Sequence, residues 1–385
     1  MASGRADDPQ AVIAGRRAAE QCRDQLQGWP PRLLLPFVAP DLDHDAVLRG
    51  IGEVFGAAPR IGCTTAAAYT RDGSAGVALT ALAGADLRVR TGSGSHHGDE
   101  VTRAAAQATL SFARRADGDL DPRWTGRTLL VFVAGRADSD ALLHELRART
   151  GAHYQVFGGL AAGERRRAAV FAGDRALRSG FACAEILSAR PFRVAQGHGF
   201  APVGAALRVS AARGPWLQQL DDRPAWTVVQ EQLGRAAAAT ASPDALPADL
   251  LLGVRRGPGH ELRVPLQRRE DGSLRLSQPV LPGDVVQCMR ADRDRMLDAG
   301  QQAVQAAVQE GRGEGAARWA GALVVECPTT QGVLGPAFAD HVDRTLQALE
   351  ARAVAIGTVQ GGFASCDGAV LAPCDAGSLV CLVPA

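Results

Sequence analysis

The sequence predicts an α/β protein in which repeated strand–helix–strand–hairpin units form two packed halves, with the sheets inside and the helices outside. One order of patterns occurs three times: an apolar run, a loop, a segment of helical period, and a second apolar run ending at Gly62, at Gly158–Gly159 or near Gly357. Strand-like alternation follows each copy, as in GVALTALAG, AAVFAGD with GFACAEIL, and GSLVCLVPA. A length of 385 residues also exceeds one ordinary core.

The first element is an amphipathic helix with a lead-in, over residues 1–30. Val12, Ile13, Ala19 and Cys22 can share one face of this helix. Charges occur throughout the segment and it has no apolar centre, so we expect no secretory signal there.

The helices of the first two copies begin with capping residues. Asp41 and Asp43 precede HDAVLRGIGEVFG, and residues 138–140 (Asp-Ser-Asp) precede ALLHELRART. Short acidic and hydroxyl side chains accept hydrogen bonds from the free N–H groups of a first helical turn. The spacing therefore predicts one helix between the two apolar runs of each copy.

A different region separates the second and third copies. PWLQQLDDRPAWTVVQEQLG predicts a strand, a turn and a helix, and the Ala- and Pro-rich residues 235–249 predict a hinge or boundary. The following β-rich segment contains Asp271-Gly272, a hairpin turn signal, and DRDRMLDAGQQAVQAAVQEG predicts a helix. We place the domain boundary after residue 225, giving domains over 31–225 and 226–385.

Composition excludes several classes of function. The formal net charge is +1, so nucleic acid and acidic membranes are not expected partners. All 42 basic residues are arginine, which rules out Schiff-base chemistry and a phosphate-loop lysine. No apolar run is long enough for a transmembrane helix, so we expect no membrane insertion. The eight cysteines are scattered without a C-x-x-C pair, which favours a reducing, cytoplasmic location.

Small polar residues and glycines follow the apolar runs, where a ligand pocket would form at a sheet edge. We expect the tips of different copies to meet around one shared cavity. The candidate ligand-binding residues are Cys63, Thr64, Thr65, Gly158, Gly159, Glu164, Cys327, Thr329 and Thr330.

Each candidate also has a purely structural interpretation. Cys63 can be a buried thiol, with Thr64 and Thr65 bonded to turn carbonyls, and the glycines can serve any tight turn. Cys63 could instead be a nucleophile, which would require a base nearby in space. No standard enzyme motif is present, so a binding protein is favoured over an enzyme.

Over nearly its whole length the chain resembles the FIST family of small-ligand-binding sensory proteins. The N-terminal half is similar through LLLPFVAPDLDHDAVLRGIGEVFGAAPRIGCTT, VFGGLAAGE, GHGFAPVGAALRVSAARG and LQQLDDRPAWTVVQEQLG. The C-terminal half is similar through VPLQRREDGSLRLSQPVLPGDVVQCM and GALVVECPTTQGVLG. The two predicted domains would thus be FIST N-terminal-like and FIST C-terminal-like.

The resemblance implies a bacterial cytoplasmic signalling protein that binds a small molecule, with amino acids as a proposed ligand class. The expected partner is a histidine kinase, a cyclic-dinucleotide enzyme or a chemoreceptor, which would be a separate protein chain. Some members are haem-binding nitric oxide sensors, and in that alternative His198 in QGHGFAPVG would be the axial ligand.

The chain departs from the family pattern at three places. Ala66 to Tyr69 stand where a small residue, Gly and Glu are usual, and the stretch after Cys327 lacks the usual arginine. Gly361-Gly362 stand where a Gly-Glu pair followed by His-Asn is usual. A carboxylate and a guanidinium are the groups that recognise an amino-acid zwitterion. A relative that has become a ligand-less scaffold is therefore a further alternative.

Overall fold

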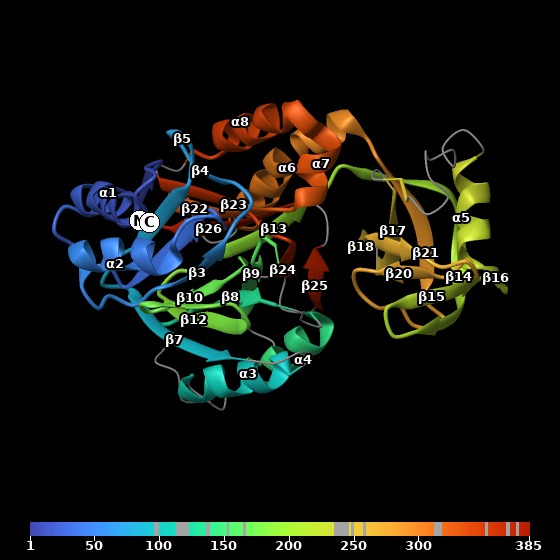
Figure 1. Cartoon of the computed structure of the whole chain (residues 1–385), viewed down its shortest axis with the longest axis horizontal. Coiled ribbons are helices and arrows are strands. Elements are labelled where there is room, and N and C mark those ends of the chain that lie inside the picture. Colours follow the sequence, from blue (N-terminus) through green and yellow to red (C-terminus); the bar gives the residue numbers. More distant parts are fainter. Residues whose placement is uncertain are drawn as a thin grey trace.

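The computed structural model describes three six-stranded mixed sheets and a separate β-rich lobe, so the predicted α/β class is confirmed (Figure 1). Among the described residues no helix is long and apolar enough to cross a bilayer. The described residues are 1–95, 100–112, 123–135, 139–151, 154–164, 167–234, 246–247, 250–256, 259–311, 318–350, 353–366, 370–374 and 377–385.

The three sheets arise from three repeats with the same order of elements. Each repeat has an edge strand, a helix, a strand, one or two helices, a parallel strand, a crossing hairpin and a returning strand. The first consists of β1 (Ala2–Ala6), α1 (Ala11–Leu26), β2 (Leu33–Val38), α2 (His44–Phe55), β3 (Ile61–Thr64), β4 (Ala68–Thr70), β5 (Gly73–Ala75) and β6 (Val77–Leu82). The second consists of β7 (Leu87–Ser95), α3 (Val101–Ala108), β8 (Gly126–Ala134), α4 (Ser139–Thr150), β9 (Gln155–Leu160), β10 (Val170–Ala172), β11 (Arg175–Leu177) and β12 (Gly180–Ser188). The third consists of β13 (Arg193–Gly197), α6 (Arg293–Gly311), β22 (Trp319–Glu326), α7 (Pro328–Leu334), α8 (Phe338–Ala348), β23 (Ala353–Thr358), β24 (Gly361–Cys366), β25 (Val370–Cys374) and β26 (Ser378–Pro384).

Each crossing hairpin leaves its own repeat and completes the sheet of another. The hairpin β4–β5 of the first repeat pairs with β23 of the third, and β10–β11 of the second pairs with β3 of the first. The hairpin β24–β25 of the third repeat pairs with β9 of the second. This cyclic exchange joins the three sheets at the ends of β3, β9 and β23.

The third repeat carries a large insertion between its edge strand and its helix. Residues 200–291, here called the β-lobe, form a second body beside the three sheets (Figure 1), and Leu251, Leu262 and Met289 share an apolar cluster with residues of the third repeat. Its elements are β14 (Phe200–Arg213), β15 (Trp216–Leu220), β16 (Arg223–Pro224), α5 (Ala225–Leu233), β17 (Leu250–Arg256), β18 (Gly259–Arg263), β19 (Pro265–Arg268), β20 (Leu274–Leu276) and β21 (Val285–Ala291). The expected turn at Asp271-Gly272 joins β19 to β20 and is confirmed.

The domain boundary placed after residue 225 falls inside the β-lobe, at the start of α5, and stays a prediction. The hinge expected over 235–249 lies outside the described residues except for 246–247.

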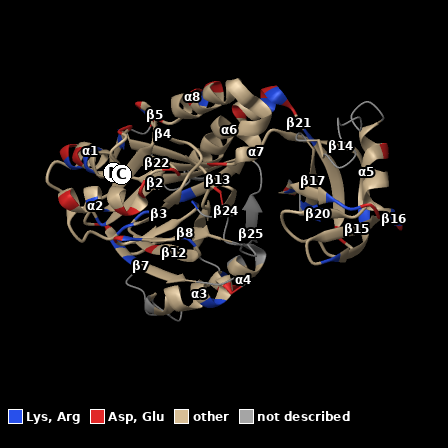
Figure 2. Ribbon diagram, viewed as in Figure 1, with Lys and Arg blue, Asp and Glu red and all other residues tan. Residues whose placement is uncertain are grey.

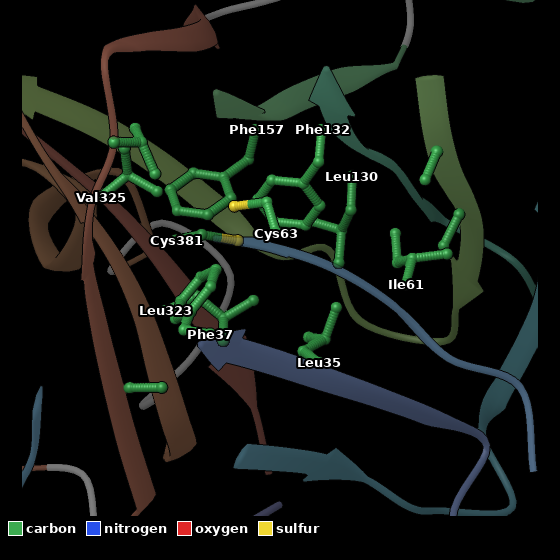
Figure 3. Close-up of a cluster of buried hydrophobic side chains, with 14 of the residues drawn as sticks. Leu35, Phe37, Ile61, Cys63, Leu130, Phe132, Phe157, Leu323, Val325 and Cys381 are labelled. Atoms are coloured by element: carbon green, nitrogen blue, oxygen red, sulfur yellow. The ribbon is translucent and has the colours of Figure 1, made fainter. Parts of the chain in front are cut away.

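One apolar core lies between the three sheets and contains residues from every repeat. Phe37 and Phe132 meet edge to face, with ring centroids 5.8 Å apart, and Phe157, Val325 and Cys381 pack in the same cluster (Figure 3). Burial of such side chains stabilises the fold by about 1.5–3 kcal/mol each. Other clusters fill the space between each sheet and its helices. Most charged residues lie on the outer helices and loops (Figure 2).

The N-terminal segment differs in part from its prediction. Residues Ala2–Ala6 form β1, paired with β6, which the small and polar sequence ASGRA did not indicate. Helix α1 buries Ala19 and Cys22, whereas Val12 and Ile13 are half-buried. The buried face is made of small residues because α1 crosses α2 closely: a Cβ at Gly15 would lie 2.2 Å from a carbonyl oxygen of α2. The predicted cap of α2 is confirmed, since Asp43 accepts a hydrogen bond from the N–H of Ala46.

Candidate functional site

The parallel strands β3, β9 and β23 of the three repeats end at one place. We call it the tip ring and define it as residues 64–67, 160–162 and 358–360. Backbone hydrogen bonds link the repeats in a cycle at this ring. They run from Ala162 N to Thr64 O (2.8 Å), from Ala66 N to Thr358 O (2.8 Å) and from Gln360 N to Leu160 O (2.9 Å). These bonds follow directly from the exchange of hairpins between sheets.

The first tip is buried. Cys63 lies in the core between the sheets (Figure 3), and burial raises the pKa of its thiol well above the usual range. The Thr64 hydroxyl donates to the carbonyl of Ala162 at 2.6 Å and accepts from the N–H of Ala169 at 3.1 Å. Thr65 is equally buried, but its Oγ1 has no hydrogen-bond partner. Thr64 thus has the bonds of a turn residue, whereas Thr65 does not.

The glycines of the second tip lie against protein backbone. A Cβ at Gly158 would lie 1.7 Å from the carbonyl oxygen of Val131, and a Cβ at Gly159 would lie 2.5 Å from that of Gly361. Glu164 is exposed, and its backbone carbonyl closes the turn before β10 by accepting from the N–H groups at 167 and 168. Close strand packing accounts for both glycines.

Residues 327–330, which follow β22 and lie outside the tip ring, bond to the start of β26. Cys327 is buried, and its N–H donates to the carbonyl of Gly377 at 3.2 Å. The N–H of Gly377 in turn donates to Thr330 Oγ1 at 3.2 Å, and Thr329 is half-buried on α7. The structure therefore joins the first tip to the second tip and to β23. Thr330, which was expected to meet these tips, lies beside β26.

A buried polar cluster next to the third tip was missed by the sequence analysis. We use the name polar cluster for Glu326, His341 and Ser378. The Ser378 hydroxyl donates to Glu326 Oε2 at 2.9 Å and lies 3.2 Å from His341 Nε2. Glu326 Oε1 also lies 3.2 Å from Nε2, and the other ring nitrogen, Nδ1, lies 3.3 Å from the carbonyl oxygen of Leu297.

The geometry of the polar cluster does not match a nucleophile–base–acid relay. Such a relay needs the hydroxyl and the carboxylate on opposite nitrogens of the imidazole, and here both approach Nε2. Burial by itself lowers the pKa of His341, but the charge of Glu326 and its hydrogen bond outweigh this effect, so the pKa is raised. The arrangement is a buried imidazole and a buried carboxylate at ion-pair distance.

The other two repeats provide an internal comparison for these positions. Glu326 pairs with Ser378 on one side and with Thr358 on the other. The equivalent residue of the first repeat is Val38, paired with Val77, and that of the second is Val133, paired with a phenylalanine. Because the same strand positions are apolar in both other repeats, the architecture does not require a carboxylate there.

Polar atoms without a partner gather at this place. Of ten such buried side-chain atoms among the described residues, two are the hydroxyls of Thr65 and Thr358, and a third, Glu326 Oε1, has only the 3.2 Å ion-pair contact with His341. Thr358 pairs with Glu326 across β22–β23, and Thr65 packs against Gly357. An unsatisfied buried polar group costs about 1–3 kcal/mol, unless a water or ligand bonds to it. The first tip adjoins the end of β23, since the N–H of Ala66 donates to the carbonyl of Thr358 at 2.8 Å, and we treat this tip and the polar cluster together as one candidate site.

Aromatic side chains lead from the candidate site to the surface. Phe338 stacks on the ring of His341 with centroids 5.6 Å apart, and half-buried Tyr69 lies over Phe338 at 6.3 Å. Burial, followed by the charge of Glu326, raises the pKa of Tyr69. Tyr69 is therefore close enough to respond to a charge change within the site.

A cavity lies at the opposite end of the sheets. It has a volume of about 240 Å³ and is lined by the ends of the returning strands, including Leu82, Ser188 and Val383. These strands run antiparallel to β2, β8 and β22, so their ends lie far from the tip ring. None of the nine predicted residues lines this cavity.

The residues around His198 do not fit a haem. His198 lies between the body and the β-lobe, where its Nδ1 accepts from the N–H of Phe200 and its Cβ faces the backbone of Gly377. Burial, followed by the charge of His260, lowers its pKa. His198 borders neither the cavity of about 240 Å³ at the opposite end of the sheets nor a second cavity of about 10 Å³ under α3 and α4. In the described part of the chain, no three His, Cys, Asp or Glu side chains are grouped to hold a metal ion.

Cys63 is expected to be unreactive in the folded protein. Its burial and raised pKa leave almost no accessible thiolate, which is the species that an alkylating reagent attacks. Iodoacetamide labelling followed by peptide mass spectrometry is expected to modify Cys63 only at the rate of unfolding. Rapid native labelling of Cys63 would instead support the nucleophile alternative.

Two family models match the chain. A model described as the FIST N domain matches residues 32–223, and one described as the FIST C domain matches residues 225–362. No curated protein matches the chain. FIST domains are associated with small-ligand-binding sensory signalling.

Proposed function

Because the chain belongs to the FIST family, we propose that it senses a small ligand at the site formed by the first tip and the polar cluster. The observation that carries this proposal is the presence of two unpartnered buried hydroxyls, on Thr65 and Thr358, together with the carboxylate of Glu326, which pairs with Thr358 across β22–β23. The carboxyl ends of β3, β22 and β23 come together there, and such edges are where α/β sheets bind ligands.

The ligand class follows from the groups that the site offers. Two threonine hydroxyls and a carboxylate suit a small molecule that presents hydrogen-bond donors, such as an amine or an amide. Glu326 provides the carboxylate that the sequence analysis did not find, and it can receive the ammonium group of an amino acid. Of the nine residues chosen from the sequence, Thr65, Thr329 and Thr330 are the ones we retain as ligand contacts or rim.

The signal would pass outward through the aromatic side chains. A ligand that displaces or orders Tyr69 changes the packing of Phe338 on α8. A ligand shifts a conformational equilibrium only as far as its affinities for the two states differ, so movement of this stack is the differential contact that the mechanism needs. We propose that a separate cytoplasmic partner, a histidine kinase, a cyclic-dinucleotide enzyme or a chemoreceptor, reads the change.

A thermal-shift screen of amino acids and small amides tests the site. A compound present at 100 times its Kd is expected to stabilise the wild-type protein by about 2.7 kcal/mol. Thr65→Val keeps the shape of the side chain and removes an unpartnered hydroxyl, so we expect unchanged or slightly higher stability and a lost ligand shift.

Thr80→Val is the matched control for this screen. Thr80 is buried on β6 and its hydroxyl also lacks a partner, but it lies outside the candidate site. The control is expected to keep the full ligand shift. Equal shifts in the two variants would place the ligand elsewhere, and no shift of the wild type by any compound would favour the ligand-less scaffold.

A further inference from the structure

The β-lobe is joined to the three-sheet body by two short connections that lie side by side. The first is Gly197–Gly199, between β13 and β14, and the second is Asp292, between β21 and α6. The N–H of Asp292 donates to the carbonyl of Gly199 at 3.0 Å, and a Cβ at Gly199 would lie 2.2 Å from the backbone of Met296. The covalent path between the β-lobe and the body therefore runs through this double connection, beside the apolar packing of Leu251, Leu262 and Met289.

Both connections are attached to the polar cluster. Leu297 lies in the first turns of α6, just after the second connection, and its carbonyl meets His341 Nδ1 at 3.3 Å. Gly377 immediately precedes Ser378, and its Cα faces the first connection: a Cβ there would lie 2.4 Å from the carbonyl oxygen of Gly197. His341 thus contacts α6, the helix that follows the second connection, and it reaches the first connection through Ser378, which pairs with Gly197 across β13–β26.

The polar cluster and the insertion occur in the same repeat. In the first two repeats the edge strand leads directly to the next helix, β1 to α1 and β7 to α3, and the equivalent strand positions are apolar. The third repeat alone carries the β-lobe together with Glu326 and Ser378. A buried ion pair beside the connections is consistent with a role for the cluster in holding the β-lobe.

We infer that His341 helps to hold the β-lobe in place. While doubly protonated it bonds to α6 and to the Glu326–Ser378 pair next to the two connections, and these contacts loosen when it loses a proton. An imidazolium donates from both nitrogens, to the Leu297 carbonyl and toward Glu326 and Ser378, whereas a neutral imidazole can donate from one nitrogen at a time. With Nδ1 still donating to Leu297, Nε2 can only accept, so its bond to Glu326 is lost. The single Ser378 proton can then bond to Nε2 or to Glu326 Oε2 but not to both, which loosens the cluster at Ser378. The inference rests on the proposed function only for the identity of the signal, since a ligand that pairs with Glu326 would also withdraw the partner of His341.

Few charged groups face His341 in the described structure. Glu326 approaches from β22 and Tyr69 from β4, while β26 contributes the Ser378 hydroxyl and α6 a backbone carbonyl. At the surface between α6 and α8, Asp298 and Arg344 pair with each other at 2.5 Å. Glu326 is therefore the main charged group that affects the protonation of His341.

The direction of the pH effect follows from the raised pKa of His341. A histidine whose pKa is higher in the folded state adds stability that is complete below its unfolded value of about 6.5. This contribution is lost as the pH rises through the folded-state pKa. The attachment is therefore expected to be strongest in mildly acidic solution and to weaken in alkaline solution.

Hydrogen–deuterium exchange of the ligand-free protein tests whether His341 holds the β-lobe in place. In the wild type, exchange of the Asp292 and Met296 amides, corrected for intrinsic rates, is expected to rise between pH 6 and pH 9. His341→Gln is expected to raise it at pH 6 by about tenfold, as for the loss of one buried hydrogen bond, and to remove the pH dependence. His144→Gln, at an exposed position on α4, should leave the wild-type pattern unchanged.

Two results would overturn the inference. One is unchanged exchange of these amides in His341→Gln, and the other is an equal rise in the core strands β2 and β22, which would indicate general destabilisation.

If His341→Gln does not fold, Glu326→Gln replaces it: without the carboxylate the pKa of His341 falls, so the pH response must move to lower pH. Because no ligand is present, failure here leaves the thermal-shift test of the proposed function intact.

Discussion

Replacing Glu326 with alanine is expected to lower the free energy of unfolding by about 3 kcal/mol, because it leaves the partner of a buried ion pair uncompensated. The value lies at the lower end of the range for buried pairs, since His341 can become neutral by releasing its proton. Ser378 also loses the acceptor of its 2.9 Å hydrogen bond. Urea unfolding at pH 6 provides the measurement.

A triple variant shows whether the polar cluster serves stability or function. Glu326→Val with Ser378→Val copies the valines found at these positions in the first repeat, and His341→Leu removes the third polar group. Replacing a buried ion pair with apolar residues of similar volume is often neutral or stabilising. We therefore expect wild-type stability or better, together with loss of the ligand shift and of the pH response.

The opposite results have clear meanings. A triple variant as unstable as Glu326→Ala would show that the polar cluster is required by the fold. A stable triple variant that still responds to the ligand would place the binding site away from the cluster.

Gly158→Ala is expected to destabilise the protein by about 3 kcal/mol or more, at or above the upper end of ordinary overpacking. The new Cβ would lie 1.7 Å from the carbonyl oxygen of Val131, and backbone atoms cannot move aside by changing rotamer. The collision falls within the parallel pair β8–β9, so relief would require the central strands of the second sheet to separate. Thermal or urea unfolding measures the loss.

Gly332→Ala is the matched control for this substitution. Gly332 lies on α7 with no other atom within 4 Å of its would-be Cβ, so alanine is expected to be neutral or to stabilise by up to about 1 kcal/mol. Equal stability of the two variants would mean that open space exists beside Gly158. Close approach of a ligand would then again be an explanation for the glycine.

Local patterns were sufficient to predict the repeats. The three copies, the α2 cap at Asp43 and the Asp271-Gly272 turn depend on residues near one another in the chain, and the structure contains all of them. Strand β1 was missed because its small residues carry no alternation. The β-lobe was noticed as a different region, but its place as an insertion within the third repeat was not.

The candidate site was only partly predictable. The expectation that tips of different copies meet matches the backbone bonds of the tip ring, but Cys63, Thr64, Gly158 and Gly159 are engaged in packing and turn contacts. The polar cluster was missed, although one signal was present: GALVVE ends an apolar strand with a charge. His341 was not among the residues predicted for the site, and the structure shows that it is fully buried.

The difference between these outcomes has one physical reason. Helical period, caps and turns depend on interactions within a few residues, which the order of amino acids specifies directly. The exchange of hairpins and the meeting of Glu326, His341 and Ser378 depend on hydrogen-bond register between strands far apart in the chain. Register is settled when whole sheets pack around a common core, because shifting a strand by one residue would turn its apolar side chains to the wrong face.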